Sequence, residues 1–298
     1  MIKQLLVPLD GSKLAEAALP TAARLSRSLG AGVILIHVIE QDAPREIHGE
    51  RHLTNEEEAC RYLGEVADSY FPPDVAVCHV HTEKVQDVAR SIADHSGELK
   101  PDLIVMCTHG EGGWRDIVAG SIAQQVIGRS QAPVLLVHPV RPGDAGGEFQ
   151  KILVALDGSS EHEGALPAAA ELAQALNGQL HLLTVVHTLG SLPGEKAASG
   201  WMLPRTTRAM LDMYEETAKE RLEELAAEWR QRGLTVVTEV RRGDPAQQIV
   251  QDAKTSGVDM IVLATHGKSG MGAFWSSSVG PRVVSSTNLP ILLIAVKK

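Results

Sequence analysis

Residues 3–31 read KQLLVPLDGSKLAEAALPTAARLSRSLGA, and residues 150–178 read QKILVALDGSSEHEGALPAAAELAQALNG. Each stretch opens with an apolar run, turns at Leu-Asp-Gly-Ser and continues with the apolar spacing of a helix. Repetition at a fixed offset indicates duplicated structural units. The offset is 147 residues here and 157 from Asp102, which recurs as Asp259, so the second copy carries ten more residues in its middle part.

The segment between the copies, RPGDAGGEF at residues 141–149, is rich in Gly and has a Pro. Such composition predicts a short flexible linker. The chain of 298 residues also has the length of two ordinary domains. We therefore place one domain at residues 1–140 and the other at residues 150–298.

Within each copy the apolar period alternates between strand and helix. The first copy predicts strands at 2–9, 33–39, 75–81, 103–107 and 134–138, with helices between them; the second repeats this with a longer helix at 205–232. Strands that are apolar at nearly every position and are separated by helices favour a parallel sheet covered on both faces. We expect α/β architecture: two doubly wound, Rossmann-like domains of five parallel strands in the order 3-2-1-4-5.

The composition restricts the partners and the location. The net charge is −9 and no basic stripe is visible, which argues against a nucleic-acid partner. No apolar run approaches the roughly 20 residues that span a bilayer, and the chain opens on a predicted strand without a leader. Three cysteines without a CxxC pair disfavour a disulfide framework or a structural zinc site. These features predict a cytoplasmic protein with no membrane partner.

Two polar turns are expected at one edge of each sheet. The first strand of each copy ends at Asp10 or Asp157, and the fourth ends in Thr-His-Gly. Ligands of open α/β sheets bind beyond the carboxyl ends of the strands. Gly110, then nine residues, then Gly120-Ser121 before a helix would offer free amides to a phosphate, and Asp10 could accept a ribose hydroxyl. Each feature alone is more often a turn or an N-cap, but their combination is more specific.

These motifs resemble the universal stress protein family in its tandem two-domain form, over almost the whole chain. ATP-binding members of the family carry Gly-x2-Gly-x9-Gly-Ser/Thr. The first copy departs from that pattern only at Cys107, which replaces the leading glycine. The second copy has Ala264 and Ser277 in place of the first and third glycines.

The resemblance implies a stress-response regulator that binds an adenine nucleotide, ATP or else AMP or ADP, at this edge. The sequence requires no metal, although Mg²⁺ can accompany ATP. Asp10 and Val38 would hold the nucleoside, while Gly110, Gly120 and Ser121 would hold phosphates. The full set of implied nucleotide-binding residues is Pro8, Asp10, Val38, Met106, His109, Gly110, Gly120, Ser121 and Ile122 in the first copy, and Asp157, Val185, Gly243, His266, Gly267, Ser277 and Ser278 in the second.

The family pattern further implies that the two final strands pair antiparallel and join the copies as an intramolecular pseudo-dimer. A homodimer of the whole chain and an unknown protein partner are both left open. Gly243-Asp-Pro245 is a common family feature after the third strand, and the first copy has Thr82-Glu83-Lys84 in the stretch we take as equivalent.

Three functions remain open. They are a nucleotide-binding regulator, a scaffold with degenerate sites that acts through protein partners, and a slow ATP-cleaving enzyme. No residue stands out as a base for attack on the γ-phosphate, so we name no catalytic residue and expect at most slow hydrolysis. GxGxxG, P-loop and GxSxG motifs are lacking.

Several other residues are of types that can bind metals or react. His79 and His81 share a strand face but lack an obvious third metal ligand. A helix start near Cys107 could lower its thiol pKa, although a small buried apolar role is the more common one. The inserted segment at 190–205 is expected to form a loop near the ligand edge.

Overall fold

The computed structural model describes residues 2–42, 46–47, 50–108, 122–139, 149–266 and 279–296. The chain divides into two compact units. Unit 1 comprises residues 1–146, 266–274 and 288–295, and unit 2 comprises residues 147–265, 275–287 and 296–298. The last strand of the second repeat, apart from Val296, is thus counted with unit 1.

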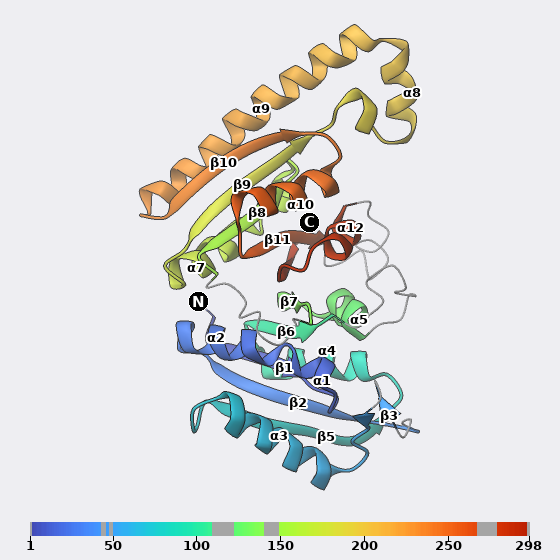
Figure 1. Ribbon diagram of the computed structural model, residues 1–298, viewed down its shortest axis with the longest axis vertical. Helices are drawn as coiled ribbons and strands as arrows, with labels where there is room; N and C mark the ends of the chain where they lie inside the picture. Colours follow the sequence, from blue (N-terminus) through green and yellow to red (C-terminus); the bar gives the residue numbers. More distant parts are fainter. Residues whose placement is uncertain are drawn as a thin grey trace. The chain divides into compact units, whose positions relative to one another are not determined.

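Unit 1 is built on the five parallel strands of the first repeat (Figure 1). They lie in the order β5-β2-β1-β6-β7, which is the predicted 3-2-1-4-5. β12 pairs antiparallel with β7, with Ile291 opposite Leu136, so the predicted pairing of the two final strands is confirmed. The strands are β1 (Gln4–Pro8), β2 (Gly32–Glu40), β5 (Ala76–Val85), β6 (Leu103–Cys107), β7 (Val134–Val137) and β12 (Ile291–Val296).

The central strands of unit 1 are buried on both faces, as a doubly wound sheet requires. Leu5, Leu6 and Val7 of β1 and all five residues of β6 are buried. A short hairpin of β3 (Glu46–Ile47) and β4 (Glu50–Arg51) forms a separate two-stranded sheet. The helices are α1 (Lys13–Glu16), α2 (Leu19–Leu29), α3 (Glu56–Tyr70), α4 (Val88–Leu99) and α5 (Ile122–Arg129).

Unit 2 repeats the arrangement with four parallel strands in the order β10-β9-β8-β11. Its strands are β8 (Lys151–Leu156), β9 (Gln179–Val186), β10 (Thr235–Arg242) and β11 (Met260–His266). Its helices are α6 (Ser160–Glu163), α7 (Leu166–Ala175), α8 (Gly194–Met202), α9 (Pro204–Gln231), α10 (Pro245–Ser256) and α12 (Gly280–Ser286), with a 3₁₀ turn, η2 (Leu189–Ser191).

Two details differ from the sequence predictions. The insertion at 190–205, expected to be a loop, is mostly the helix α8, which is joined to the long α9 by Leu203. Phe149, which we assigned to the flexible linker, is 1% exposed and packs into the core. In the described part of the chain, no helix has both the length and the apolarity needed to cross a membrane.

Candidate functional site

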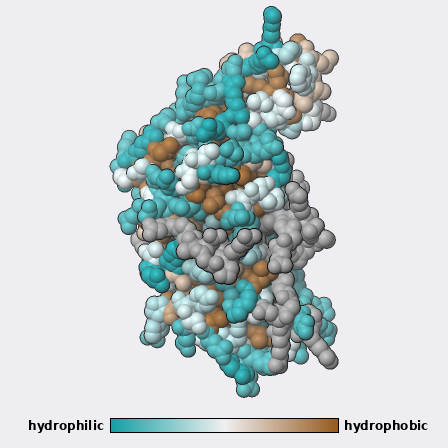
Figure 2. All heavy atoms as spheres, in the orientation of Figure 1, coloured by the Kyte–Doolittle hydropathy of each residue, from teal (hydrophilic) through white to brown (hydrophobic). Residues whose placement is uncertain are grey.

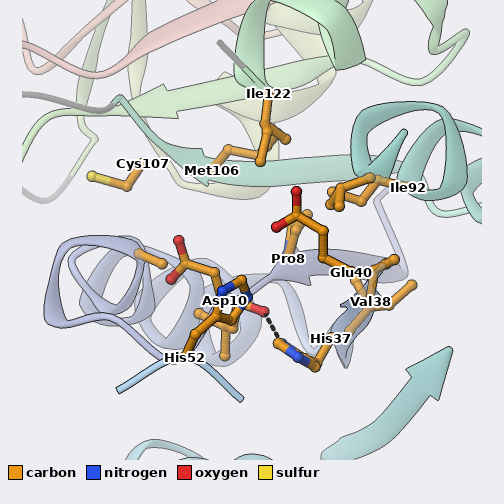
Figure 3. Close-up of a pocket in the computed structure, with 14 residues that line it drawn as sticks. Pro8, Asp10, His37, Val38, Glu40, His52, Ile92, Met106, Cys107 and Ile122 are labelled. Carbon is orange, nitrogen blue, oxygen red and sulfur yellow. Dashed lines mark hydrogen bonds between the residues drawn. The ribbon is translucent and has the colours of Figure 1, made fainter. Parts of the chain in front are cut away.

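A pocket opens at the carboxyl ends of β1, β2 and β6 in unit 1 (Figure 3). Five of the predicted residues, Pro8, Asp10, Val38, Met106 and Ile122, line it together. They come from three strands, the turn after β1 and the start of α5, far apart in the sequence. The remaining lining residues are Leu9, Ala15, Ile36, His37, Glu40, His52, Val88, Ile92 and Cys107.

Asp10 is held by the turn that follows β1. Its Oδ1 accepts hydrogen bonds from the Ser12 amide at 2.9 Å and from Ser12 Oγ at 2.7 Å. Ser12 Oγ in turn accepts from the Ala15 amide at 3.1 Å and caps α1. Gly11 has φ +92°, a conformation that side chains other than glycine rarely adopt. The Leu-Asp-Gly-Ser sequence therefore fixes the Asp10 carboxylate at the pocket wall.

His37 holds the same turn in place through the backbone of Leu9. It is 1% exposed; its Nδ1 lies 2.8 Å from the Leu9 carbonyl oxygen and its Nε2 lies 3.3 Å from the Leu53 carbonyl oxygen. Burial lowers the pKa of His37, opposed in part by these two hydrogen bonds. A neutral ring carries a single proton: on Nδ1 it donates the shorter bond and holds Leu9, next to Asp10, in place (Figure 3), and Nε2 then donates no bond to the Leu53 carbonyl.

Other polar side chains of the pocket were not predicted from the sequence. Glu40 ends β2 just after a register shift that follows Val38, and its carboxylate joins a lining that is mostly apolar. His52 is 4% exposed and its Nδ1 lacks a hydrogen-bond partner among the described residues. His37 could have been noticed in the sequence, because it interrupts an otherwise apolar strand, GVILIHVIE.

Cys107 is the last residue of β6 and Thr108 follows it, and the two side chains have different roles. Burial, and then the negative charge of Asp10, raise the pKa of the Cys107 thiol to about 12. The lowered thiol pKa that a nearby helix start could have produced is therefore not supported. Cys107 is a small buried side chain. The amide of Thr108 donates to the Val137 carbonyl at 2.8 Å, and its Oγ1 lies 3.2 Å from His138 Nδ1, so the threonine ties β6 to β7.

The turn of the second repeat has the same backbone but a different partner. Asp157 Oδ1 accepts from the Ser159 amide at 2.9 Å and from Ser159 Oγ at 2.6 Å, and Gly158 has φ +80°. However, His162 Nδ1 lies 2.7 Å from Asp157 Oδ2. The hydrogen bond to Asp157 raises the pKa of His162, against the effect of burial. Burial acts to raise the pKa of Asp157, but bonds from His162 and Ser159 outweigh it and hold that pKa below its usual range.

Comparison with known proteins agrees with this architecture. The model of the universal stress protein family matches residues 1–138 and 148–295. This chain belongs to the universal stress protein family. A universal stress protein of Mycolicibacterium smegmatis is 27% identical over 97% of this chain and 96% of its own length. Universal stress protein Rv2623 of Mycobacterium tuberculosis is 24% identical over 97% of this chain and 95% of its own length.

A solved structure shows the same fold. The crystal structure of a universal stress protein from Archaeoglobus fulgidus aligns with a TM-score of 0.64 at 19% identity, and covers 98% of this chain and 96% of that one. The tandem form of the universal stress protein family is therefore shown both in sequence and in fold.

Part of the predicted site of this universal stress protein lies outside the described residues. These positions are His109, Gly110, Gly120, Ser121, Gly267, Ser277 and Ser278. His266 is the last residue of β11. Val185 lies near the end of β9, and Gly243, with φ +144°, follows β10 and donates its amide to the Val186 carbonyl at 3.0 Å.

The equivalence proposed for Gly243-Asp-Pro245 was wrong. Asp244 caps α10 and pairs with Arg282 at 2.8 and 2.9 Å. In the first repeat the cap of the matching helix α4 is Asp87, which pairs with Arg129 at 2.7 Å. Residues 82–84 instead lie within β5, which is longer than its sequence pattern indicated.

A third histidine joins the two that share a strand face. The His95 ring, on α4, lies 4.9 Å from the His79 ring and 4.8 Å from the His81 ring, measured between centroids. Burial and the neighbouring histidines lower the pKa of His79. No group of three or more His, Cys, Asp or Glu side chains within the described ranges is arranged to bind a metal ion. The cluster is therefore a packing contact between β5 and α4.

Proposed function

We propose that this universal stress protein binds an adenine nucleotide, with ATP as the first candidate, in the pocket of the first repeat. We further propose that it acts as a regulator whose conformation or choice of partner responds to occupancy. The observation that supports this most directly is the convergence of Pro8, Asp10, Val38, Met106 and Ile122 on one pocket at the carboxyl edge of the sheet.

The chemistry of the lining suits the base and the sugar. The pocket wall contributed by Val38, Met106 and Ile122 is apolar, as a planar base requires. Asp10 supplies a carboxylate acceptor for ribose hydroxyls, and its position is fixed by two hydrogen bonds from Ser12. Gly110, Gly120 and Ser121 would bind the phosphates, because they match the phosphate-binding positions of the family pattern.

We also propose that the two repeats differ in affinity. The acceptor of the second repeat is already engaged by His162, and the matching residue of the first repeat is Ala15. A ribose would have to displace an ion pair at Asp157. Ala264 and Ser277, which replace glycines of the family pattern, should also lower the affinity of the second repeat, because glycines allow close approach of the backbone to a ligand. One nucleotide per chain is the expected stoichiometry.

Two matched substitutions test the proposal. Asp10→Ala should weaken ATP binding by about tenfold or more, because a charged acceptor is lost from the site. Asp157→Ala removes the same side chain from the same turn and should leave ATP binding within about twofold. Isothermal titration of the full chain measures both. Equal effects of the two substitutions would contradict the assignment to the first repeat.

The alternative functions predict other results. A scaffold with degenerate sites would show no thermal shift with ATP, ADP or AMP at about millimolar concentration. A slow ATP-cleaving enzyme would release phosphate from ATP, and that turnover would vanish in Asp10→Ala and His109→Ala.

A further inference from the structure

We propose that the outward face of α9 is a self-association surface, on which α9 of a second copy packs antiparallel. This inference stands independently of nucleotide binding. It rests on the length of the helix, on the apolar side chains that it exposes, and on the order of charges along it.

α9 is longer than its counterpart. It has 28 residues, whereas α3, the matching helix of the first repeat, has 15. In Figure 1, α9 continues past the ends of β9 and β10 toward α8. Its buried residues follow one another at spacings of 4, 11, 4 and 3, which places them on one face of the helix: Thr207, Leu211, Leu222, Ala226 and Trp229. The remaining faces of the helix therefore meet solvent in the described structure.

The extended half of α9 exposes three large apolar side chains among polar ones such as Arg205, Arg208 and Glu216. Met210 is 42%, Met213 70% and Tyr214 54% exposed. The adjoining corner adds Trp201 at 67% and Met202 at 82%. Figure 2 shows pale and brown side chains gathered in this region, at the upper right. Single exposed apolar residues need no explanation, but a group of large ones on one helical hairpin marks an interaction surface.

The charges on the outward face are ordered. Arg205, Ala209, Met213, Glu216 and Glu220 follow one another at spacings of four, four, three and four, so they form one row along the helix, and all are exposed. The row is basic at its start, apolar in its centre and ends in two glutamates, of which Glu216 already pairs with Lys219 at 2.9 Å. Arg205 has no ion pair with any residue that the structure describes.

Such a row is complementary to itself when it is reversed. An antiparallel partner, related by a twofold axis near Ala209 and Met213, would bring Arg205 of each copy beside Glu216 and Glu220 of the other. A parallel partner would instead place Arg205 against Arg205 and the glutamates against each other. The order of charges thus selects a second copy of this chain, in antiparallel orientation, as the occupant.

A pair of matched substitutions tests the apolar centre. Sedimentation equilibrium of the full chain should show a concentration-dependent dimer, and Met213→Glu should weaken it by about tenfold or more. Val77→Glu, at a residue 62% exposed on β5, adds the same charge to another apolar surface site and should leave the dimer within about twofold. Both positions are exposed, so the variants should fold; circular dichroism checks this.

A charge exchange tests the orientation. Arg205→Glu alone and the double variant Glu216→Arg/Glu220→Arg should each weaken the dimer by about fivefold or more at low salt. The triple variant that combines them restores opposite charges and should recover wild-type association within about threefold. A chain that stays monomeric up to about 200 µM, a dimer that ignores Met213→Glu, or a triple variant that does not recover would each overturn the proposal.

Discussion

His162 Nδ1 lies 2.7 Å from Asp157 Oδ2, and the matching pair of positions in the first repeat is Ala15 and Asp10. The two Asp-Gly-Ser turns are otherwise alike, with the same serine bonds and a glycine at positive φ. Asp157 is thus held in an ion pair with His162, whereas the first repeat has Ala15 at the matching position and its Asp10 lines the pocket. This difference leads to predictions about both binding and stability.

Substitution of His162 by alanine should make the second repeat more like the first. In His162→Ala the Asp157 carboxylate loses the His162 partner of Oδ2, while Oδ1 keeps its bonds from Ser159, and Oδ2 regains its capacity to accept a hydroxyl. Native mass spectrometry of the chain with excess ATP should then show an increased fraction carrying two nucleotides, whereas wild type should carry one. If both proteins carry the same number, the ion pair does not control the second site.

The Asp157–His162 pair should stabilise the fold only within a window of pH. The pKa of His162 is raised in the folded state, so this contribution is complete below the unfolded histidine value of about 6.5 and is lost as pH rises through the folded value. The pKa of Asp157 is lowered, so the contribution also fades as pH falls below about 4. The pair is partly exposed, so solvent screening limits it to less than about 1 kcal/mol.

Urea unfolding of wild type and His162→Ala measures this contribution. The difference in free energy of unfolding should be largest near pH 5.5 and should shrink toward zero by about pH 9. A difference that stays the same across this range of pH would show that His162 stabilises the fold through packing and not through its charge.

The three cysteines should differ in reactivity. Cys60 and Cys78 are exposed, whereas Cys107 is buried with a pKa raised to about 12. Burial, and then the charges of Cys60 and Asp68, also raise the pKa of Cys78. Because the thiolate is the reactive form, a thiol reagent at pH 8 should modify Cys60 first, Cys78 more slowly and Cys107 only after unfolding. Mass spectrometry of the labelled chain gives the order, and labelling of native Cys107 at the rate of Cys60 would contradict its assigned burial.

The two turn glycines should respond differently to alanine. Gly158→Ala should cost about 1 kcal/mol, because φ is +80° but a new Cβ meets open space. Gly11→Ala should cost more, about 1–3 kcal/mol, because φ is +92° and the Cβ would lie 3.0 Å from Leu53 Cδ1. Gly64→Ala, inside α3 with open space around it, should instead stabilise by about 0.5–1 kcal/mol. Thermal unfolding measures all three, and equal losses for Gly11→Ala and Gly158→Ala would show that Leu53 moves aside freely.

Much of the fold could be predicted because its signals are local. Interactions among a few neighbouring residues are enough to predict the strands β1 and β6 and the Leu-Asp-Gly-Ser turn. The duplication then supplied the strands of the sheet and most of the helices twice, and parallel strands with helical crossovers allow few strand orders. The prediction for residues 190–205 failed because Gly, Pro and Ser favour a loop locally, whereas the structure forms α8 there and packs Gly200 near Leu189 and Thr207.

By itself, the sequence determined a duplicated parallel α/β chain and which residues end its strands, because periodicity and turn chemistry act between neighbours. Only the tertiary structure decided how those strand ends are used. It brought Asp10, Glu40 and Met106 to one pocket, buried Cys107 deeply enough to suppress its thiolate, and aimed His162 at Asp157. The electrostatics of a side chain depend on the distance and burial of groups that another part of the chain supplies, and no local pattern contains that information.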